Sequence, residues 1–311
     1  MSPYRVLSID GGGIRGILTA RILERIEAAI PGFINQIDLF AGTSTGGLLA
    51  LGLAAGLSPT VLRELYDQFA NRVFADSLLD DLKDLGNLIG AEYSVEPLKE
   101  ILESTFGALT LSQLNKRVMV ATFKLDNEGK GPGGVRMWKM KFFENYPGPG
   151  SDGGERVVDV AIRTSVAPAY FPTYQGYIDG GVAASNPAMC ALSQALDKVT
   201  GRQNVQNVAL LSMGTGYNPH FLPIKDADWG LAQWAPHMLN IMLEADQDMV
   251  DFQCRQVLDQ QYFRVNPVLP KEIGLGSVKD IPDLLATAEK TDLSQAIAWA
   301  RQNFFAGKAS A

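Results

Sequence analysis

Two glycine-rich turns near the N-terminus restrict this chain more than any other feature of its sequence. One turn, at residues 10–16, follows an apolar run at residues 5–9, and the other, at residues 42–47, follows an apolar run at residues 37–41. Apolar residues at helical spacing follow each turn. A repeated order of buried strand, tight turn and helix is typical of an α/β protein with a mainly parallel sheet.

The rest of the chain continues this pattern without a linker that would separate a second domain. Further strand patterns stand at residues 118–125, 135–143, 177–178 and 208–213. The last part of the chain looks mostly helical. We therefore expect three layers, α/β/α, around a central, mainly parallel sheet. The prediction is one domain spanning residues 1–311, with a motif-bearing core at about 4–217 and a helical portion at about 218–311.

Composition excludes several classes of function. The net charge of −7 argues against nucleic acid as the main partner. Two cysteines and two histidines are too few for a disulfide framework or the common metal centres, so we expect no metal and no cofactor. The N-terminus lacks the pattern of a signal peptide, and the longest uncharged apolar run, at residues 48–57, is too short to cross a bilayer. We expect a cytoplasmic protein with peripheral membrane contact at most.

The second turn reads Gly-Thr-Ser-Thr-Gly at residues 42–46 and fits the GxSxG pattern of serine hydrolases. In that pattern a serine sits on a sharp, strained turn between a strand and a helix. Glycines two residues away on either side prevent steric collision. This context predicts Ser44 as a nucleophile whose hydroxyl is exposed at the carboxyl end of the sheet, above the N-terminus of the next helix.

The first turn, with Gly11, Gly12 and Gly13 in succession, also matches the GxGxxG pattern of dinucleotide sites. Two details count against a dinucleotide. Asp38, at the right distance to bind a ribose, precedes its strand instead of ending it, and Asp10 would set a carboxylate beside the pyrophosphate. Three consecutive glycines favour a turn whose backbone amides stay available to an anion.

A serine nucleophile needs a neighbouring base, and the sequence leaves two candidates. His220 and His237 follow Ser44 and Asp179 in the order of an α/β-hydrolase triad, but neither stands in a recognisable motif. The alternative is a dyad in which Asp179, at the start of Asp-Gly-Gly, accepts the serine proton directly.

These motifs together resemble those of the patatin-like phospholipases. The resemblance rests on Asp-Gly-Gly-Gly-Ile-Arg-Gly at 10–16, Gly-Thr-Ser-Thr-Gly at 42–46 and Asp-Gly-Gly at 179–181, in that order. Residues 165–172, 186–187 and 212–216 are also similar to plant patatins. The match covers roughly residues 4–217.

The resemblance implies a patatin-like fold and a serine lipid acyl hydrolase of phospholipase A or lysophospholipase type, acting on membrane phospholipids or other acyl lipids without a metal. It implies a dyad of Ser44 and Asp179, and it places a basic residue at Arg15, which would support the turn or orient a head group. The implied oxyanion hole consists of backbone amides of Gly11, Gly12 and Gly13. An acyltransferase with the same chemistry and a nucleotide-regulated membrane-degrading effector are the alternatives.

Two further segments bear on lipid access. Apolar residues recur near helical spacing between Trp229 and Leu243, which predicts a helix packed on the core or, alternatively, a surface that meets an acyl chain or bilayer. The acidic stretch at residues 76–84 contains three leucines and predicts a solvated helix face or an amphipathic lid.

Overall fold

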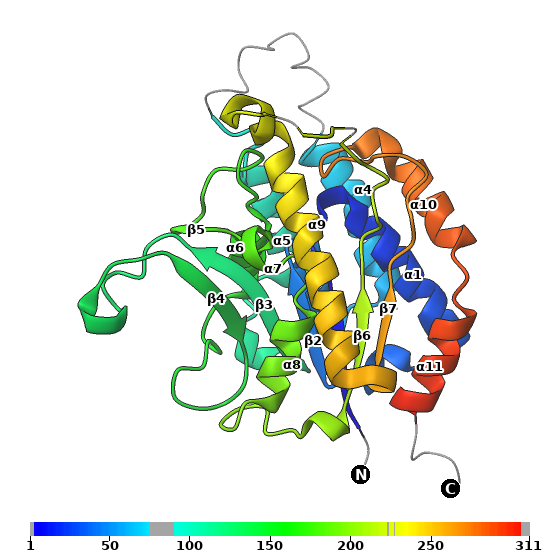
Figure 1. Cartoon of the computed structure of the whole chain (residues 1–311). Coiled ribbons are helices and arrows are strands. Elements are labelled where there is room, and N and C mark those ends of the chain that lie inside the picture. The colour runs from blue at the N-terminus through cyan, green and yellow to red at the C-terminus, as the bar shows by residue number, and fades with distance from the viewer. Residues whose placement is uncertain (1–2, 75–89, 223, 227, 306–311) are drawn as a thin grey trace, which may run out of the picture.

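One seven-stranded sheet organises the chain (Figure 1), in a computed structural model that describes residues 3–74, 90–222, 224–226 and 228–305. The strand order is β4-β3-β2-β1-β6-β7, and β5 pairs with β3. Neighbouring strands are parallel except that β4 and β5 run antiparallel to β3. The strands are β1 (Tyr4–Ile9), β2 (Leu39–Thr43), β3 (Arg117–Lys124), β4 (Lys139–Glu144), β5 (Tyr177–Asp179), β6 (Val208–Met213) and β7 (Tyr262–Val265). The predicted α/β fold with a mainly parallel sheet is confirmed. The acidic stretch at 76–84 lies outside the described residues.

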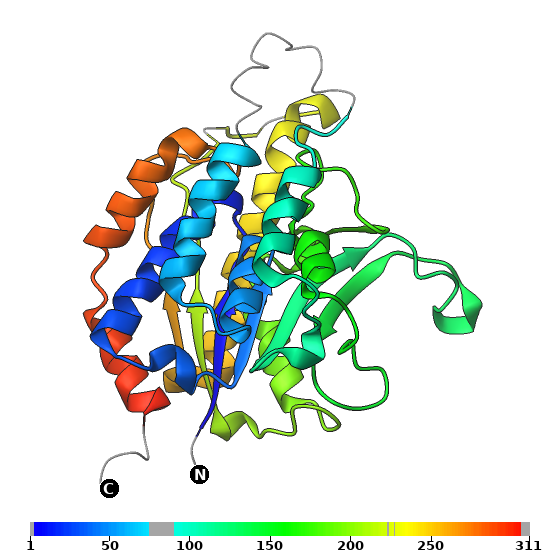
Figure 2. The same ribbon diagram turned by 180° about the vertical axis from the view of Figure 1, so that it is seen from behind.

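Helices cover both faces of the sheet, as the two opposite views show (Figures 1 and 2). One face carries α1 (Gly16–Ala29), α3 (Thr45–Ala54), α4 (Pro59–Arg72), α5 (Glu96–Phe106), α6 (Val157–Ser165), α10 (Ile281–Lys290) and α11 (Ser294–Phe304). The other carries α8 (Ala188–Leu196) and α9 (Leu231–Leu258). Two short helices are α2 (Phe33–Gln36) and α7 (Gly181–Ala184).

Alternation of side chains along each strand produces these two layers. Val6 of β1 packs in the core formed with α8 and α9, whereas Leu7 points into the core on the opposite face. Leu210 and Leu211 of β6 divide in the same way. Strands that are buried on both faces read as continuous apolar runs, which is why β1 and β6 could be identified from the sequence.

The expectation that residues 218–311 are helical is wrong at Tyr262–Val265. These residues form β7, which pairs in parallel with β6 and extends the sheet at that edge. The strand has only four residues, and one of them is Arg264, so its sequence lacks the apolar run that identifies a buried strand. The extended conformation of β7 is determined by its pairing with β6, which is distant in sequence.

The expectation that the helix near residues 229–243 packs on the core is also wrong. α9 has 28 residues and is therefore about 42 Å long, whereas a six-residue strand such as β6 spans about 20 Å. Its first buried residue is Gln247; among residues 231–246 no side chain that the structure describes is buried. Figure 1 shows that this half of α9 extends past the carboxyl edge of the sheet. We call residues 231–245 the α9 overhang.

Candidate active site

Ser44 lies between the end of β2 and the start of α3, in the turn that the GxSxG pattern predicts. Its φ of 55° and ψ of −127° are unfavourable for a residue with a side chain. A Cβ atom on Gly42 would lie 2.1 Å from the carbonyl oxygen of Gly46, and one on Gly46 would lie 2.2 Å from that of Ile9. Both glycines are therefore required for the turn to close.

A hydrogen bond from outside the turn holds the strained serine in place. The Ser44 N–H donates to Thr164 Oγ1 (2.8 Å), and the Thr164 hydroxyl donates to the carbonyl of Ala121 (2.6 Å). Thr164 belongs to α6 and is buried. The serine backbone is thus tied to both α6 and β3, which offsets the cost of its conformation.

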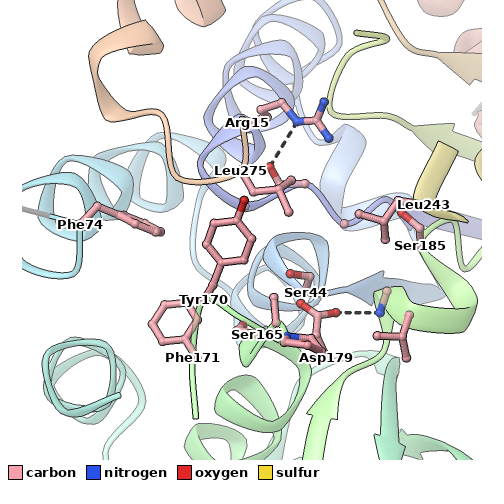
Figure 3. A pocket seen from close by; sticks show the side chains of 17 residues that line it. Arg15, Ser44, Phe74, Ser165, Tyr170, Phe171, Asp179, Ser185, Leu243 and Leu275 are labelled. Carbon is pink, nitrogen blue, oxygen red and sulfur yellow. Dashed lines mark hydrogen bonds between the residues drawn. The ribbon is translucent and has the colours of Figure 1, made fainter. Parts of the chain in front are cut away.

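The strand register brings Asp179 to Ser44. β2 runs along one side of β3 and ends with Thr43 opposite Ala121. β4 occupies the other side of β3. β5 therefore pairs with β3 on the same side as β2, beyond the end of β2. It runs antiparallel to β3 and ends with Asp179 opposite Thr122. The two strands therefore meet end to end, and Figure 3 shows the side chains of Ser44 and Asp179 together there.

Burial and hydrogen bonds determine the electrostatics of Asp179, which is 4% exposed. Burial raises the pKa of this carboxyl to about 6, while hydrogen bonding from the side chain of Ser44 and from the backbone of Gly181 opposes the rise. The Gly181 N–H donates to Asp179 Oδ1 (2.7 Å). The carboxyl thus ionises near neutral pH and lies within reach of a hydroxyl, as a general base requires.

The glycine turn after β1 leaves two backbone amides without a hydrogen-bond partner among the described residues, whereas the family resemblance implies three donors. The Gly11 N–H donates to the carbonyl of Ser185 (2.9 Å) and so is not available to a ligand in this structure. Within the described residues, the amides of Gly12 and Gly13 have no hydrogen-bond partner. Both glycines line the same pocket as Ser44. The turn has no room for side chains, because a Cβ atom on Gly12 would lie 2.2 Å from Thr215 Oγ1.

Arg15 also lines this pocket and is 5% exposed. Its Nε donates to the carbonyl of Gly12 over a long 3.4 Å. Burial lowers the pKa of the guanidinium from its ordinary value. No carboxylate of the described residues forms an ion pair with Arg15, and Figure 3 shows its guanidinium on the far side of the pocket from Asp179. A buried cation that forms no ion pair with the described carboxylates is suited to an anionic ligand.

Two apolar pockets meet at Ser44. The larger encloses about 620 Å³ including its open mouth, and the smaller encloses about 420 Å³. Both are lined by Gly13, Ser44, Phe74, Ser165 and Phe171. Asp179 and Arg15 line only the larger pocket. The smaller continues between α3, α4 and α5, where its lining includes Leu48, Tyr66, Phe69, Val73 and Leu98.

Neither histidine reaches the site. His220 Nε2 lies 2.8 Å from Glu244 Oε1, and its Nδ1 lies 3.5 Å from Glu272 Oε1. The ring of His237 stacks on Trp229 with a centroid separation of 5.8 Å. Neither ring lines the pocket that contains Ser44.

The features that suggested a dinucleotide also lie elsewhere. Asp38 precedes β2 and accepts a hydrogen bond from the Arg5 N–H (2.8 Å), at the opposite edge of the sheet from the glycine turn. Asp10 is completely buried and pairs with Arg264, Oδ2 to Nη2 at 2.6 Å. In the described part of the chain, no cluster of three or more His, Cys, Asp or Glu side chains could hold a metal ion.

Sequence reasoning missed the residues that support the glycine turn from beneath. Arg264 of β7 pairs with Asp10 and also donates from Nη1 to Ser212 Oγ (2.7 Å) on β6. Thr215 donates its hydroxyl to the carbonyl of Gly11 (2.9 Å). Asp10 and Arg264 are 254 positions apart, so only the long-range order of the strands reveals their pairing. The one signal in the sequence was Arg264, a charged residue in a short stretch of otherwise apolar residues.

Comparison with known proteins places the chain in a family. A family model described as "Patatin-like phospholipase" matches residues 7–192. The chain is similar to a protein named "cGAMP-activated phospholipase" from Pseudomonas aeruginosa, with 31% identity over 85% of this chain and 78% of that protein. It is also similar to "Patatin-like protein 2" from Arabidopsis thaliana, with 28% identity over 93% of this chain and 80% of that protein.

A solved structure, VipD from Legionella pneumophila, matches with a TM-score of 0.46 and 13% identity, over 97% of this chain and 67% of that chain. No helix among the described residues is both long enough and apolar enough to span a membrane. The family match over residues 7–192 includes Ser44, Asp179 and the glycine turn. The chain belongs to the patatin-like phospholipase family of lipid acyl hydrolases.

Proposed function

We propose that this protein hydrolyses the carboxylic esters of phospholipids, with Ser44 as nucleophile and Asp179 as base. The main observation behind the proposal is that the ends of β2 and β5 lie next to each other on the same side of β3. This arrangement brings a strained serine and a buried carboxyl together beside amides that have no partner. Nothing else among the described residues that line the pocket could take the serine proton as readily at neutral pH.

The reaction has two stages with Asp179 in both. In the first, Ser44 Oγ attacks the ester carbonyl and its proton passes to the Asp179 carboxylate. The tetrahedral intermediate then collapses, the C–O bond of the ester breaks, and the leaving alkoxide takes that proton, which leaves an acyl-serine. In the second, water attacks the acyl carbon, Asp179 accepts its proton, and the proton returns to Ser44 as the fatty acid leaves.

The developing oxyanion would be held by backbone amides of Gly12 and Gly13. The Gly11 amide, which the family resemblance includes in the hole, is already used by Ser185, so we assign Gly11 a structural role instead. The N-terminus of α3, directly after Ser44, adds a favourable electrostatic field. Loss of one such donor in comparable sites costs about 3 kcal/mol of transition-state stabilisation.

The two pockets suggest how the substrate lies. The smaller pocket, bounded by leucine, valine and aromatic side chains, would take the acyl chain. The larger, with the buried guanidinium of Arg15, would take the glycerol and the anionic phosphate of the head group. The ester carbon would then lie at Ser44, where both pockets meet.

A serine-directed fluorophosphonate tests this proposal. Mass spectrometry should locate the adduct on Ser44, and Ser44→Ala should reduce the turnover of a phospholipid ester by on the order of 10⁶. Ester hydrolysis by Ser44→Ala at the rate of the unmodified protein would refute the assignment. In the presence of glycerol as an acceptor, a hydrolase should still release mainly free fatty acid, whereas the acyltransferase alternative predicts mainly acylglycerol.

Activation by cGAMP is a second candidate property, favoured by the similarity to the Pseudomonas aeruginosa protein. The plant protein is similar over a larger share of this chain, and its name mentions no activator. Phospholipid hydrolysis measured with and without cGAMP distinguishes the two cases. A rate that is unchanged by cGAMP would rule out this form of regulation.

A further inference from the structure

The α9 overhang up to Leu243, together with Trp229 and Gly230 before it, carries no formal charge. From Trp229 to Leu243, fifteen consecutive residues include no Asp, Glu, Lys or Arg. Solvent-exposed helices normally carry charged residues, and helices without charge are normally buried. This segment lacks charge and is nevertheless exposed.

Large apolar side chains gather on one side of the overhang. Leu231 is 82% exposed, and Met238, Ile241 and Met242 are each exposed by more than two fifths. Their spacing of seven, three and one residues keeps them on one face of the helix. Trp229 and Trp234 contact each other edge to face at the beginning of the helix, with ring centroids 5.2 Å apart. Tryptophan is favoured where an apolar phase meets water.

The overhang stands beside the entrance to the active site. Leu243, near its end, lines the pocket that contains Ser44 and lies close to Gly181, where an added Cβ atom would contact the Leu243 side chain at 3.4 Å. α9 begins beyond the carboxyl edge of the sheet, which is also the edge where β1 and β2 end at the glycine turn and at Ser44 (Figure 1). The apolar face and the pocket mouth thus share one end of the molecule.

We propose that the α9 overhang is the surface by which this protein contacts a zwitterionic phospholipid bilayer. The inference rests on the proposed function, since a lipid acyl hydrolase must reach a substrate that is embedded in such a surface. Leu231, Met238, Ile241 and Met242 would enter the boundary between head groups and acyl chains, with the tryptophans at head-group depth. A lipid leaving the bilayer would then pass along Leu243 into the pocket.

Charge decides which type of bilayer is expected. The charge-free segment is followed by Glu244, Asp246 and Asp248 and preceded by Asp226 and Asp228, with only Lys225 as a nearby cation in the sequence. Anionic lipids would be repelled or unaffected, and binding should not depend strongly on salt. A rival surface exists on the β3–β4 hairpin, where Trp138 is 71% exposed. Lys130 and Arg136 of this hairpin pair with Glu128 and Asp126, and Lys124 and Lys139 leave it with more cations than anions. That surface would favour anionic lipids instead.

The binding experiment uses the full-length Ser44→Ala protein, so that vesicles remain intact. Co-sedimentation with phosphatidylcholine vesicles is compared before and after Leu231→Ser and Met238→Ser are introduced together. The matched control is Phe252→Ser, which removes a 63% exposed side chain on the same helix, about 21 Å beyond Met238. We expect at least tenfold weaker binding from the double substitution and unchanged binding from the control.

A second measurement separates this inference from the proposed function. In the active protein, the double substitution should lower hydrolysis of vesicle phospholipid at least tenfold and leave the kcat/KM for a monomeric, water-soluble ester unchanged. If the unsubstituted protein does not cleave the soluble ester, the proposed function fails, while the Ser44→Ala binding result still stands. Equal vesicle binding with and without the double substitution would overturn the inference.

Two other outcomes would also overturn it. Binding that requires phosphatidylglycerol, disappears in 0.5 M salt and is lost in Trp138→Ala would assign the membrane contact to the hairpin. A dimer in sedimentation equilibrium that dissociates on the double substitution, without vesicle binding by either form, would show that a second copy of the chain covers the overhang.

Discussion

Replacing Asp179 by Asn should abolish ester hydrolysis and make the folded protein more stable at neutral pH. Burial raises the pKa of Asp179 to about 6 from an ordinary value of 3.8. A carboxyl whose pKa is higher in the folded protein than in the unfolded chain binds its proton more tightly when folded. Folding therefore becomes less favourable as the pH rises from 3.8 through 6, and the full cost is present above pH 6.

The size of this cost follows from the two pKa values. A difference of about 2 pKa units between 3.8 and 6 corresponds to about 3 kcal/mol at pH 8 and to about 2 kcal/mol at pH 5.5. Asn has no charge to bury, and its carbonyl oxygen can still accept the hydrogen bond from the Gly181 N–H. Asp179→Asn should therefore raise the free energy of unfolding by up to about 3 kcal/mol at pH 8.

Urea unfolding at pH 8 and pH 5.5 measures this difference. Ser44→Ala is the matched control, because it also removes activity but keeps the buried carboxylate, and it should not become more stable by a similar amount. Unfolding of Asp179→Asn at the same or a lower urea concentration than the unsubstituted protein at pH 8 would refute the reasoning.

The same pKa predicts the pH profile of the reaction. The base acts as a carboxylate, so the kcat/KM for a water-soluble ester should be constant above pH 7 and about tenfold lower at pH 5. A carboxyl with its ordinary pKa of 3.8 would leave the rate at pH 5 almost unchanged. A profile that is flat from pH 8 to pH 5 would therefore contradict a pKa near 6 for the catalytic carboxyl.

Two further substitutions test the glycine turn and the histidines. Gly12→Ala should lower kcat by about 10² or more, because the new Cβ atom would collide with Thr215 and displace the amide donors, whereas Gly274→Ala, which meets nothing within 4 Å, should keep full activity. The double variant His220→Ala/His237→Ala should keep its kcat, since neither ring lines the pocket; a loss above 100-fold in a folded variant would restore a histidine triad.

Local signals were sufficient to predict the fold class and the serine turn. β1, β2 and the glycine turns lie within the first fifty residues, and each can be recognised from the residue pattern in its immediate surroundings. Contacts within the turn and with the adjacent strand leave no room for a side chain at Gly42 or Gly46. The spacing of these glycines around Ser44 therefore indicates the sharp turn. The sequence therefore identified the nucleophile from its immediate surroundings.

The partner of the serine could not be predicted from local signals. Asp179 reaches Ser44 because β5 continues the side of β3 that β2 vacates, and no pattern within β5 encodes that register. From the residues alone, a histidine triad and a dyad both remained open, although the lack of motif context at His220 and His237 counted against the triad. The family resemblance then favoured Asp179. The use of the Gly11 amide by Ser185 is likewise a contact between distant segments.

The apolar series at the beginning of α9 shows a different limit. Periodic leucine, methionine and tryptophan side chains look the same whether a helix covers a core or stands in solvent. The length of the helix decides between the two, because 28 residues exceed what the strands can cover. Whether α9 extends beyond the sheet depends on its length relative to that of the strands it covers. Neither the sequence of the helix nor that of a strand contains this comparison alone.

α9 connects the exposed overhang to the catalytic turn through its buried half. Asp246 Oδ2 accepts a hydrogen bond from the Asn186 N–H (2.9 Å), and Gln247 Nε2 donates to Ser185 Oγ (3.1 Å). The Ser185 carbonyl in turn accepts the Gly11 N–H. Because this bond fixes Gly11, it also fixes the direction in which the next two amides point. α9 thus carries the proposed lipid surface at one end and contacts the segment that orients the proposed oxyanion donors near its middle. A displacement of α9 would therefore be passed through Ser185 to Gly11 and to the amides that follow it.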